Sequence, residues 1–222
     1  MFHDSRFMFY VLELNMHTFI LGEKLGMTEW WNKKKEIEPI TLVDCKRTIL
    51  VGKKVLKKDG YSSEILGIVK KKQEGKDRKS NFLKSNANFS VLKEFRTDET
   101  EASENSPEAG ADLKVDIFKE GDLVKVTALS KGKGTQGVVK RHHFAGGPKS
   151  HGHRHALRSA GSIGSAFPEH VQKGKRMAGS MGYEKVTVKN SKVAWVDVEK
   201  NIMAIKGAIP GRKGSWVKII GN

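Results

Sequence analysis

The chain has very little cysteine and no long apolar run. Its single cysteine, Cys45, excludes an internal disulfide, which fits a reducing intracellular compartment. No stretch of about 18 apolar residues occurs, so the sequence predicts no membrane-spanning helix. The short apolar stretch from Phe7 to Leu14 lacks a preceding basic region and a following cleavage site of small residues. We therefore interpret residues 1–15 as an N-terminal extension, disordered or upstream of a start at Met16, rather than as a signal peptide.

Acidic side chains are scarce in the second half of the chain. The whole sequence has 41 lysines and arginines against 25 aspartates and glutamates, a net charge of +16. Residues 1–120 contain 22 basic and 20 acidic side chains, whereas residues 121–222 contain 19 and 5. Within 131–190 the carboxylates are Glu169 and Glu184, against 12 lysines and arginines. A segment of one charge sign repels itself unless a polyanion neutralises it, which favours nucleic acid over an anionic membrane or a merely solvated surface.

Helical periodicity is also scarce, because most of the apolar pattern repeats every second residue. Residues 199–201 predict a hairpin turn, and Asn81–Phe95 is the best candidate for a helix. Many short strands with Gly-rich connections indicate a mainly β (α+β) fold, with a small closed β-barrel rather than alternating βαβ units. The predicted strands are Ile40–Val43, Thr48–Val51, Leu123–Leu129, Lys185–Val188, Val193–Val198, Ile202–Ile205 and Trp216–Ile220.

Two segments lack the apolar periodicity of a core. Residues 71–112 begin basic and end acidic, which predicts a loop or disordered insertion because little apolar surface is available to offset ordering. Residues 131–190 are basic and Gly-rich and predict a long irregular extension. We expect both to belong to a single domain spanning 16–222. The extension contains four isolated apolar residues that we expect to anchor it, Phe144, Ile163, Phe167 and Met177.

Gly132, Gly134 and Gly137 match the dinucleotide-binding pattern G-x-G-x-x-G. Such a site needs a helix that opens at the glycines and an acidic residue about 20 positions later. Here a Gly-Gly-Pro break at 146–148 interrupts the following segment, and the next acid is Glu169. The sequence therefore predicts no dinucleotide cofactor.

Ser162 and Ser180 lie in A-G-S-x-G, one residue away from the nucleophile pattern of α/β-hydrolases. That class needs an acid and then a histidine later in the chain. No histidine follows Ser180, and Ser162 is followed only by the adjacent pair Glu169 and His170. Tight Gly/Ser turns are the better interpretation, and the chain is not expected to be an enzyme.

Five histidines cluster between residues 142 and 155, but their neighbours argue against a metal site. No cysteine or carboxylate lies among them, and the nearby arginines and lysine would repel a cation. Histidine can instead stack on bases and donate hydrogen bonds to RNA. We therefore predict neither a metal nor another cofactor.

The remaining signal is a series of cations interleaved with glycines. Small residues let the main chain approach a phosphate backbone, and arginine and lysine supply contacts to phosphate. No helix suited to the major groove of DNA is evident here, which favours RNA. The candidate RNA-binding residues are Lys131, Lys133, Lys140, Arg141, His142, His143, Lys149, His151, His153, Arg154, His155, Arg158, Lys173, Lys175, Arg176 and Lys185.

Three strings carry a resemblance to a known family. Residues 130–190 include KRHHFAGGP, GSIG and KGKRMAGSMG, residues 193–211 end in KGAIPG, and residues 19–31 read FILGEKLGMTEWW. Together these motifs are highly specific, and they resemble the universal large-subunit ribosomal protein L-three in its bacterial form. The resemblance spans about residues 16–220.

The resemblance implies a closed β-barrel of the translation-protein type in a structural constituent of the large ribosomal subunit, located in the cytoplasm. It implies direct binding near the 3′ end of large-subunit (23S-type) rRNA, nucleation of subunit assembly, and ribosomal proteins fourteen and nineteen as neighbours. It also implies that 131–190 penetrates the rRNA towards the peptidyl transferase centre, with His151–Gly164 at its tip. No small-molecule substrate is implied. Ser165 stands where many bacterial relatives carry a methylated glutamine, so that modification is not expected.

Two other functions remain open at the level of sequence. Residues 121–139 look like the strand–loop–strand of small barrels in non-ribosomal translation and transcription factors. Such factors do not need a sixty-residue basic extension. An RNA-modifying enzyme would need an acid, base or cofactor arrangement, and the basic segment offers only two carboxylates.

Overall fold

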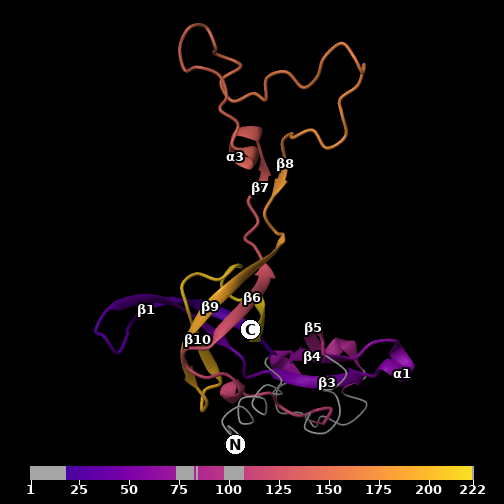
Figure 1. Cartoon of the computed structure of the whole chain (residues 1–222), viewed down its shortest axis with the longest axis vertical. Helices are drawn as coiled ribbons and strands as arrows, with labels where there is room; N and C mark the ends of the chain where they lie inside the picture. Colours follow the sequence, from indigo (N-terminus) through magenta and orange to yellow (C-terminus); the bar gives the residue numbers. More distant parts are fainter. Residues whose placement is uncertain (1–18, 74–82, 84, 98–107, 222) are drawn as a thin grey trace, which may run out of the picture. The chain divides into compact units, whose positions relative to one another are not determined.

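The computed structural model describes residues 19–73, 83, 85–97 and 108–221, and it is mainly β, as predicted (Figure 1). The chain divides into two compact units. The first, here called the body, comprises Met1–Leu129 with Val186–Asn222. The second, here called the basic unit, is Ser130–Lys185.

The body is built around a sheet of six strands. They are β1 (Phe19–Trp31), β2 (Ile37–Asp44), β6 (Leu123–Leu129), β9 (Lys185–Asp197), β10 (Ile202–Lys206) and β11 (Trp216–Gly221). Their order in the sheet is β1-β11-β6-β9-β10-β2. Antiparallel pairings join β1 to β11, β11 to β6, β9 to β10 and β10 to β2. Strand β1 also pairs antiparallel with β2, with Glu23 opposite Asp44 at one end and Trp31 opposite Ile37 at the other. The first and last strands of this order are therefore neighbours as well.

Every strand of this sheet contributes to one apolar cluster. Side chains alternate between the two faces of a strand, so a period-two pattern directs one set of residues into the same interior. Burial of this apolar surface is the main driving force for assembling the sheet. Residues of the cluster that are at most 1% exposed include Ile20, Val43, Val126, Val193, Met203 and Ile219.

A second sheet packs against the opposite face of β1. It consists of β3 (Thr48–Lys54), β4 (Ser63–Val69) and β5 (Phe89–Arg96), in the order β3-β4-β5. Phe19 and Leu21 of β1 join its buried cluster, and the Phe19 and Phe95 rings stack with centroids 4.4 Å apart. Strand β1 is therefore apolar on both faces and belongs to both cores.

Among the described residues of the body, one lysine is buried. Lys24 is 7% exposed, and its Nζ donates hydrogen bonds to the carbonyls of Ile209 at 2.7 Å and Gly211 at 3.1 Å. The same residue exchanges main-chain hydrogen bonds with Gly214 and Ser215. A buried ammonium is tolerated only where such acceptors replace water, so Lys24 ties β1 to the loop before β11.

The helical elements described in the body are short. They are α1 (Leu56–Asp59), η1 (Lys71–Gln73), η2 (Asn86–Asn88) and η3 (Val115–Ile117), and Leu83 is also helical. Among the described helices of either unit, none is both long and apolar enough to span a membrane.

All seven predicted strands are present, with longer bounds in most cases. The strands predicted at Lys185–Val188 and Val193–Val198 belong to one continuous strand, β9, which ends at Asp197. The hairpin at 199–201 is also confirmed, because β9 and β10 pair antiparallel across it. The sequence pattern predicted two strands because residues 189–192 between them are polar, but β9 continues through these residues.

The predicted helix over Asn81–Phe95 is wrong for its second half. Asn81, Phe82 and Lys84 lie outside the described residues, and Leu83 is helical. Phe89–Arg96 form β5, in which Arg96 lies opposite Ser63 of β4 and Phe89 lies opposite Val69. The spacing of the apolar residues permits a helix, but pairing with β4 buries Phe89 and Phe95, so tertiary contacts override the local preference. The described part of the 71–112 insertion is therefore not a loop throughout.

Candidate RNA interface

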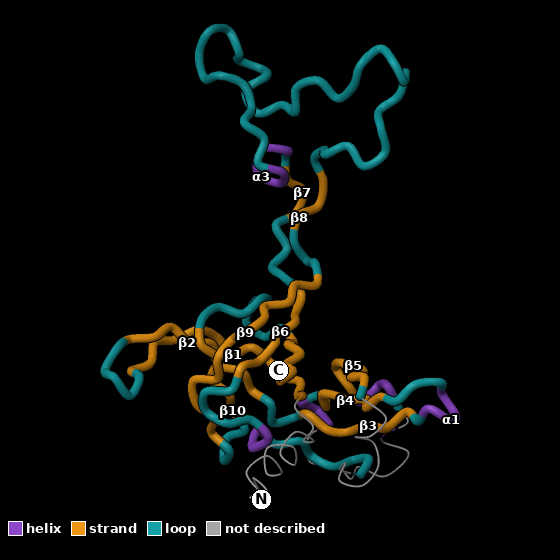
Figure 2. The backbone as a smooth tube through the Cα atoms, viewed as in Figure 1, coloured by secondary structure: helices purple, strands orange, loops and turns teal. Residues whose placement is uncertain are grey.

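The basic unit contains a short two-stranded stem. Strand β7 (Gly134–Gln136) pairs antiparallel with β8 (Gly179–Met181), with Thr135 opposite Ser180. Helix α3 (Val138–His142) follows β7 directly, and the rest of the unit is loop (Figure 2). The two ends of a 56-residue segment, Ser130–Lys185, are thus joined by main-chain pairing.

Further hydrogen bonds join the two legs of the stem outside the strands. Ser130 N donates to the Glu184 carbonyl at 2.8 Å, and Glu184 N donates to Ser130 Oγ at 3.2 Å. Lys133 N donates to the Met181 carbonyl at 2.9 Å. Between these contacts lies Gly182 at φ 77°, where an added Cβ would collide with the Lys131 carbonyl. Only glycine permits both this conformation and this approach of the two backbones.

Two of the candidate RNA-binding residues make contacts within the stem. Arg141 Nη1 donates to the Met177 carbonyl at 2.9 Å, and His142 Nε2 lies 3.1 Å from the same oxygen. The guanidinium lies over Gly179, where a Cβ would be 2.7 Å from Nη1. Both side chains are half-buried. They link α3 to the segment that enters β8.

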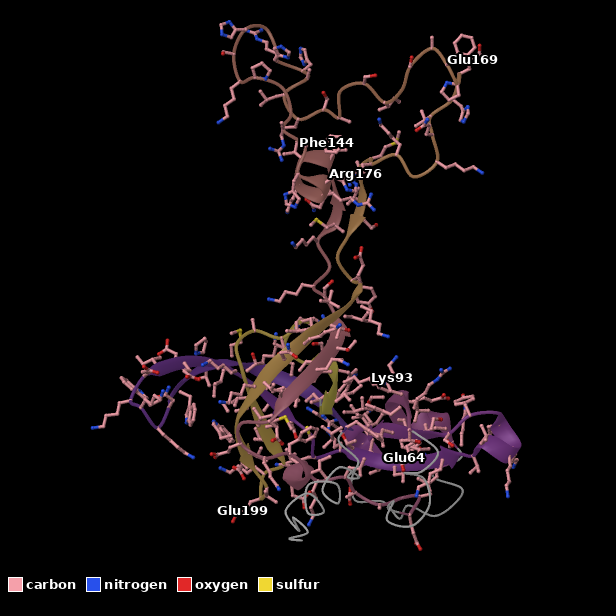
Figure 3. The ribbon with its side chains drawn as sticks, viewed as in Figure 1. Glu64, Lys93, Phe144, Glu169, Arg176 and Glu199 are labelled. Carbon is pink, nitrogen blue, oxygen red and sulfur yellow. The ribbon has the colours of Figure 1, made fainter. Side chains whose placement is uncertain are left out.

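Beyond the stem, most hydrogen bonds of the basic unit are local. Ser159 Oγ donates to the Ala156 carbonyl and Ser162 Oγ to the Gly164 carbonyl. A longer link joins Gly147 N to the Leu157 carbonyl at 2.9 Å. Phe144 lies where α3 ends, and Glu169 lies on a later loop away from the helix (Figure 3). These loops have turns but no layer packed against them.

The basic unit has almost no apolar interior. Val138 is its only buried residue, at 6% exposed, in a range that the structure describes throughout. Of the expected anchors, Phe144 is half-buried, but Phe167 is 81%, Ile163 43% and Met177 38% exposed. The expectation that these three anchor the segment is therefore wrong, because a two-stranded stem with loops offers no second layer to receive them.

The unit is strongly cationic, and its cations are available to a ligand. It has 11 lysines and arginines and two glutamates, Glu169 and Glu184. No ion pair involves a lysine or arginine of 130–185, a range that the structure describes completely. Of the sixteen candidate RNA-binding residues, all but Arg141 and His142 are exposed. Unpaired exposed cations at this density favour binding of a polyanion.

The geometry gives little support to the other motifs. The glycine pattern at 132–137 contains β7 itself, and α3 after it has only five residues. The Ser162 hydroxyl is engaged in a local turn. Across the described ranges, no three His, Cys, Asp or Glu side chains gather where they could hold a metal ion.

One residue of the stem, Tyr183, is notable in the structure but was not predicted as a functional residue from the sequence. Tyr183 is 74% exposed and has a positive φ of 56°. Neither charge nor spacing distinguishes it from its neighbours. Its only local signal is a large aromatic residue between a glycine and two charged residues, in a segment without a core.

Comparison with known proteins identifies the family. Residues 69–200 match the family model for Ribosomal protein L3. Large ribosomal subunit protein uL3 of Chloroherpeton thalassium is 42% identical over 90% of this chain and 97% of its own length. The proteins of the same name from Oceanobacillus iheyensis and Thermosipho melanesiensis are 40% and 41% identical, again over 90% of this chain and over 95% and 96% of their own. Since these matches cover both the body and the basic unit, the chain is a ribosomal protein of the L3 family.

Proposed function

We propose that this chain is a structural constituent of the large ribosomal subunit and contacts large-subunit rRNA through the basic unit. The observation that carries the proposal is the set of exposed cations on Ser130–Lys185, none of them in an ion pair within that range. The relatives are named as large ribosomal subunit proteins, which supports the same assignment and a place on the cytoplasmic ribosome. The family is one of structural proteins rather than enzymes.

The charge and packing of the basic unit support RNA as the partner. A segment with one buried residue has little apolar burial to offset the entropy of ordering its loops. Neutralising its cations with phosphates releases counterions, which favours binding most strongly at low salt. The stem is held by its own hydrogen bonds, so the loops beyond it are the part that we expect RNA to order.

The finer aspects of the role follow from the family resemblance. We infer that the protein binds rRNA directly near its 3′ end, helps to nucleate subunit assembly, and extends 131–190 towards the peptidyl transferase centre. Ribosomal proteins fourteen and nineteen are the proposed neighbours. The ring of pairings in the six-stranded sheet supports a closed barrel of the translation-protein type as the platform for these contacts.

Sedimentation of the tagged protein from cell extract tests the proposal. In sucrose gradients at low and high salt, the protein should remain with the large subunit through the high-salt wash. Buried rRNA contacts dissociate slowly once the subunit is assembled, whereas peripheral electrostatic contacts are screened. Release of the free protein to the top of the high-salt gradient would instead favour a transient RNA-binding factor.

A further inference from the structure

Tyr183 combines an unfavourable backbone conformation with an exposed ring. Its φ of 56° lies in the left-handed region, which glycine and asparagine adopt readily and which a bulky residue adopts at a cost. The side chain is 74% exposed, so burial does not offset that cost. Among the described residues, no hydrogen bond or ring contact involves this side chain. Strain without compensation inside the protein indicates a role towards something outside it.

The backbone on both sides holds Tyr183 firmly in this position. Gly182 lies against the Lys131 carbonyl, and Glu184 is bonded to Ser130 through both its N–H and its carbonyl. On the facing leg, Gly132 is so close that a Cβ there would lie 3.9 Å from Tyr183 Cβ. The ring is therefore presented from a clamped turn of the stem rather than from one of the loops.

The charges around the ring indicate what it would contact. Lys131 and Lys133 flank Gly132 on the facing leg, and Lys185 follows two residues after Tyr183. All three lysines are exposed and outside any ion pair, and Glu184 is the single acid beside them. An exposed aromatic face among lysines matches single-stranded RNA, in which a base stacks on the ring and the adjacent phosphate meets the cations. A binding site for a protein partner would present a wider exposed apolar patch than a single ring.

We propose that Tyr183 is a stacking site for an unpaired base of ribosomal RNA, with Lys131 and Lys133 contacting the adjacent phosphates. The inference rests on the proposed function, since it names the chemistry of one contact in the same interface. It also explains why a tyrosine occupies a position whose backbone favours glycine or asparagine.

Substitution of Tyr183 tests whether its ring binds RNA or stabilises the protein. A stacking ring predicts a loss of affinity without a loss of stability. Tyr183→Asn removes the ring and suits the left-handed backbone, so the variant should melt at or above the wild-type temperature. Its affinity for protein-free large-subunit rRNA should nevertheless fall about 5- to 150-fold, the loss of one stacked base. Tyr183→Phe keeps the ring and should bind as the wild type does.

The salt dependence of binding supplies a second discriminating measurement. Tyr183→Asn should leave the slope of log affinity against log salt unchanged, whereas Lys131→Ala should reduce it by about one. Equal affinity of the Tyr183→Asn variant and the wild type would overturn the stacking site while leaving the proposed function intact. Failure of the wild-type protein to bind this rRNA at all would instead overturn the proposed function, and the stacking site with it.

Discussion

Lys24 and Arg154 carry the same charge but lie in opposite surroundings. Lys24 is 7% exposed and donates to two main-chain carbonyls of the body, whereas Arg154 is exposed on the basic unit and is in no ion pair there. Removing a buried donor leaves its acceptors unsatisfied, while removing an exposed cation changes only its interaction with a ligand. The two residues should therefore respond differently to substitution.

Lys24→Met should lower the free energy of unfolding of the protein by about 2–3 kcal/mol. Methionine keeps the apolar stem but leaves the Ile209 and Gly211 carbonyls without their charged donor. Urea denaturation followed by circular dichroism measures the change. Lys200→Met, at a side chain 69% exposed, is the matched control and should change stability by less than about 0.5 kcal/mol. Equal stability of both variants would show that the buried hydrogen bonds contribute nothing.

The double variant Arg154→Ala/Arg158→Ala should weaken rRNA binding and leave the body folded. Each lost phosphate contact should reduce the salt slope by about one, so the pair should reduce it by about two. Filter binding at several salt concentrations measures the slope. Replacement of Lys57 and Lys58, two exposed cations of α1 in the body, serves as the control and should have the smaller effect. A cooperative loss of circular dichroism in the arginine variant would mean that the core extends into the basic unit.

At the scale of elements, the three-stranded sheet carries a compact polar cluster on its surface. Lys54 Nζ donates to Glu94 Oε1 at 2.7 Å, and Tyr61 OH donates to Glu94 Oε2 at 2.9 Å. These two donors, Lys54 first, hold the pKa of the Glu94 carboxyl below its ordinary value, and Glu94 in turn raises the pKa of the Lys54 ammonium. The cluster links β3, the segment before β4, and β5.

The lowered pKa of Glu94 predicts a pH dependence of stability. A carboxyl whose pKa is lower in the folded than in the unfolded state stabilises the folded state at pH values above its ordinary pKa of about 4.3. This contribution disappears as the pH falls through the pKa of the folded state. Glu94→Gln should therefore unfold at a lower temperature than the wild type at pH 7, and the difference should shrink towards pH 3. Calorimetry at both pH values measures it. Tyr61→Phe, which removes the second donor to Glu94 but keeps Lys54 beside it, should give a smaller difference. A constant difference for Glu94→Gln would exclude the ion pair as its cause.

On the scale of the whole molecule, the two units are stabilised by different interactions. The three buried apolar clusters lie in the body, where all six strands of the main sheet and all three of the smaller one contribute. The basic unit has one buried residue, and main-chain hydrogen bonds with the Arg141 contact hold its stem. The apolar burial that stabilises the fold therefore lies in the body, and the proposed RNA contacts lie in the basic unit.

Replacing Ser130–Lys185 with a short Gly/Ser linker should leave the body folded. Leu129 and Val186 belong to β6 and β9, and Val193 of β9 exchanges main-chain hydrogen bonds with Gly121 and Asp122 just before β6. The variant should retain the wild-type midpoint of urea denaturation within a small margin and lose most of its affinity for rRNA. An unfolded product would contradict the division between the units, and undiminished affinity would place the RNA contacts on the body.

Much of the architecture followed from local sequence patterns. The period-two alternation of Leu123–Leu129 and Ile202–Ile205 placed β6 and β10 nearly to their bounds, since alternation is a property of the strand itself. The segregation of charge marked the basic unit within a few residues of Ser130–Lys185. The specific motifs of the second half were sufficient by themselves to indicate the family.

Other features depended on contacts between distant residues. Strand β5 exists because β4 pairs with it, and its local spacing alone favoured a helix. The sequence made Arg141 and His142 candidates for RNA contact, but the return leg brings the Met177 carbonyl to both of them. Tyr183 became notable only through its positive φ and its exposure. Composition and periodicity are local and so determined the fold class and the charged segment, and the sequence motifs indicated the family. Register, close approach and exposure arise only when segments far apart in the chain meet, so the tertiary structure decided which side chains hold the stem and which remain exposed.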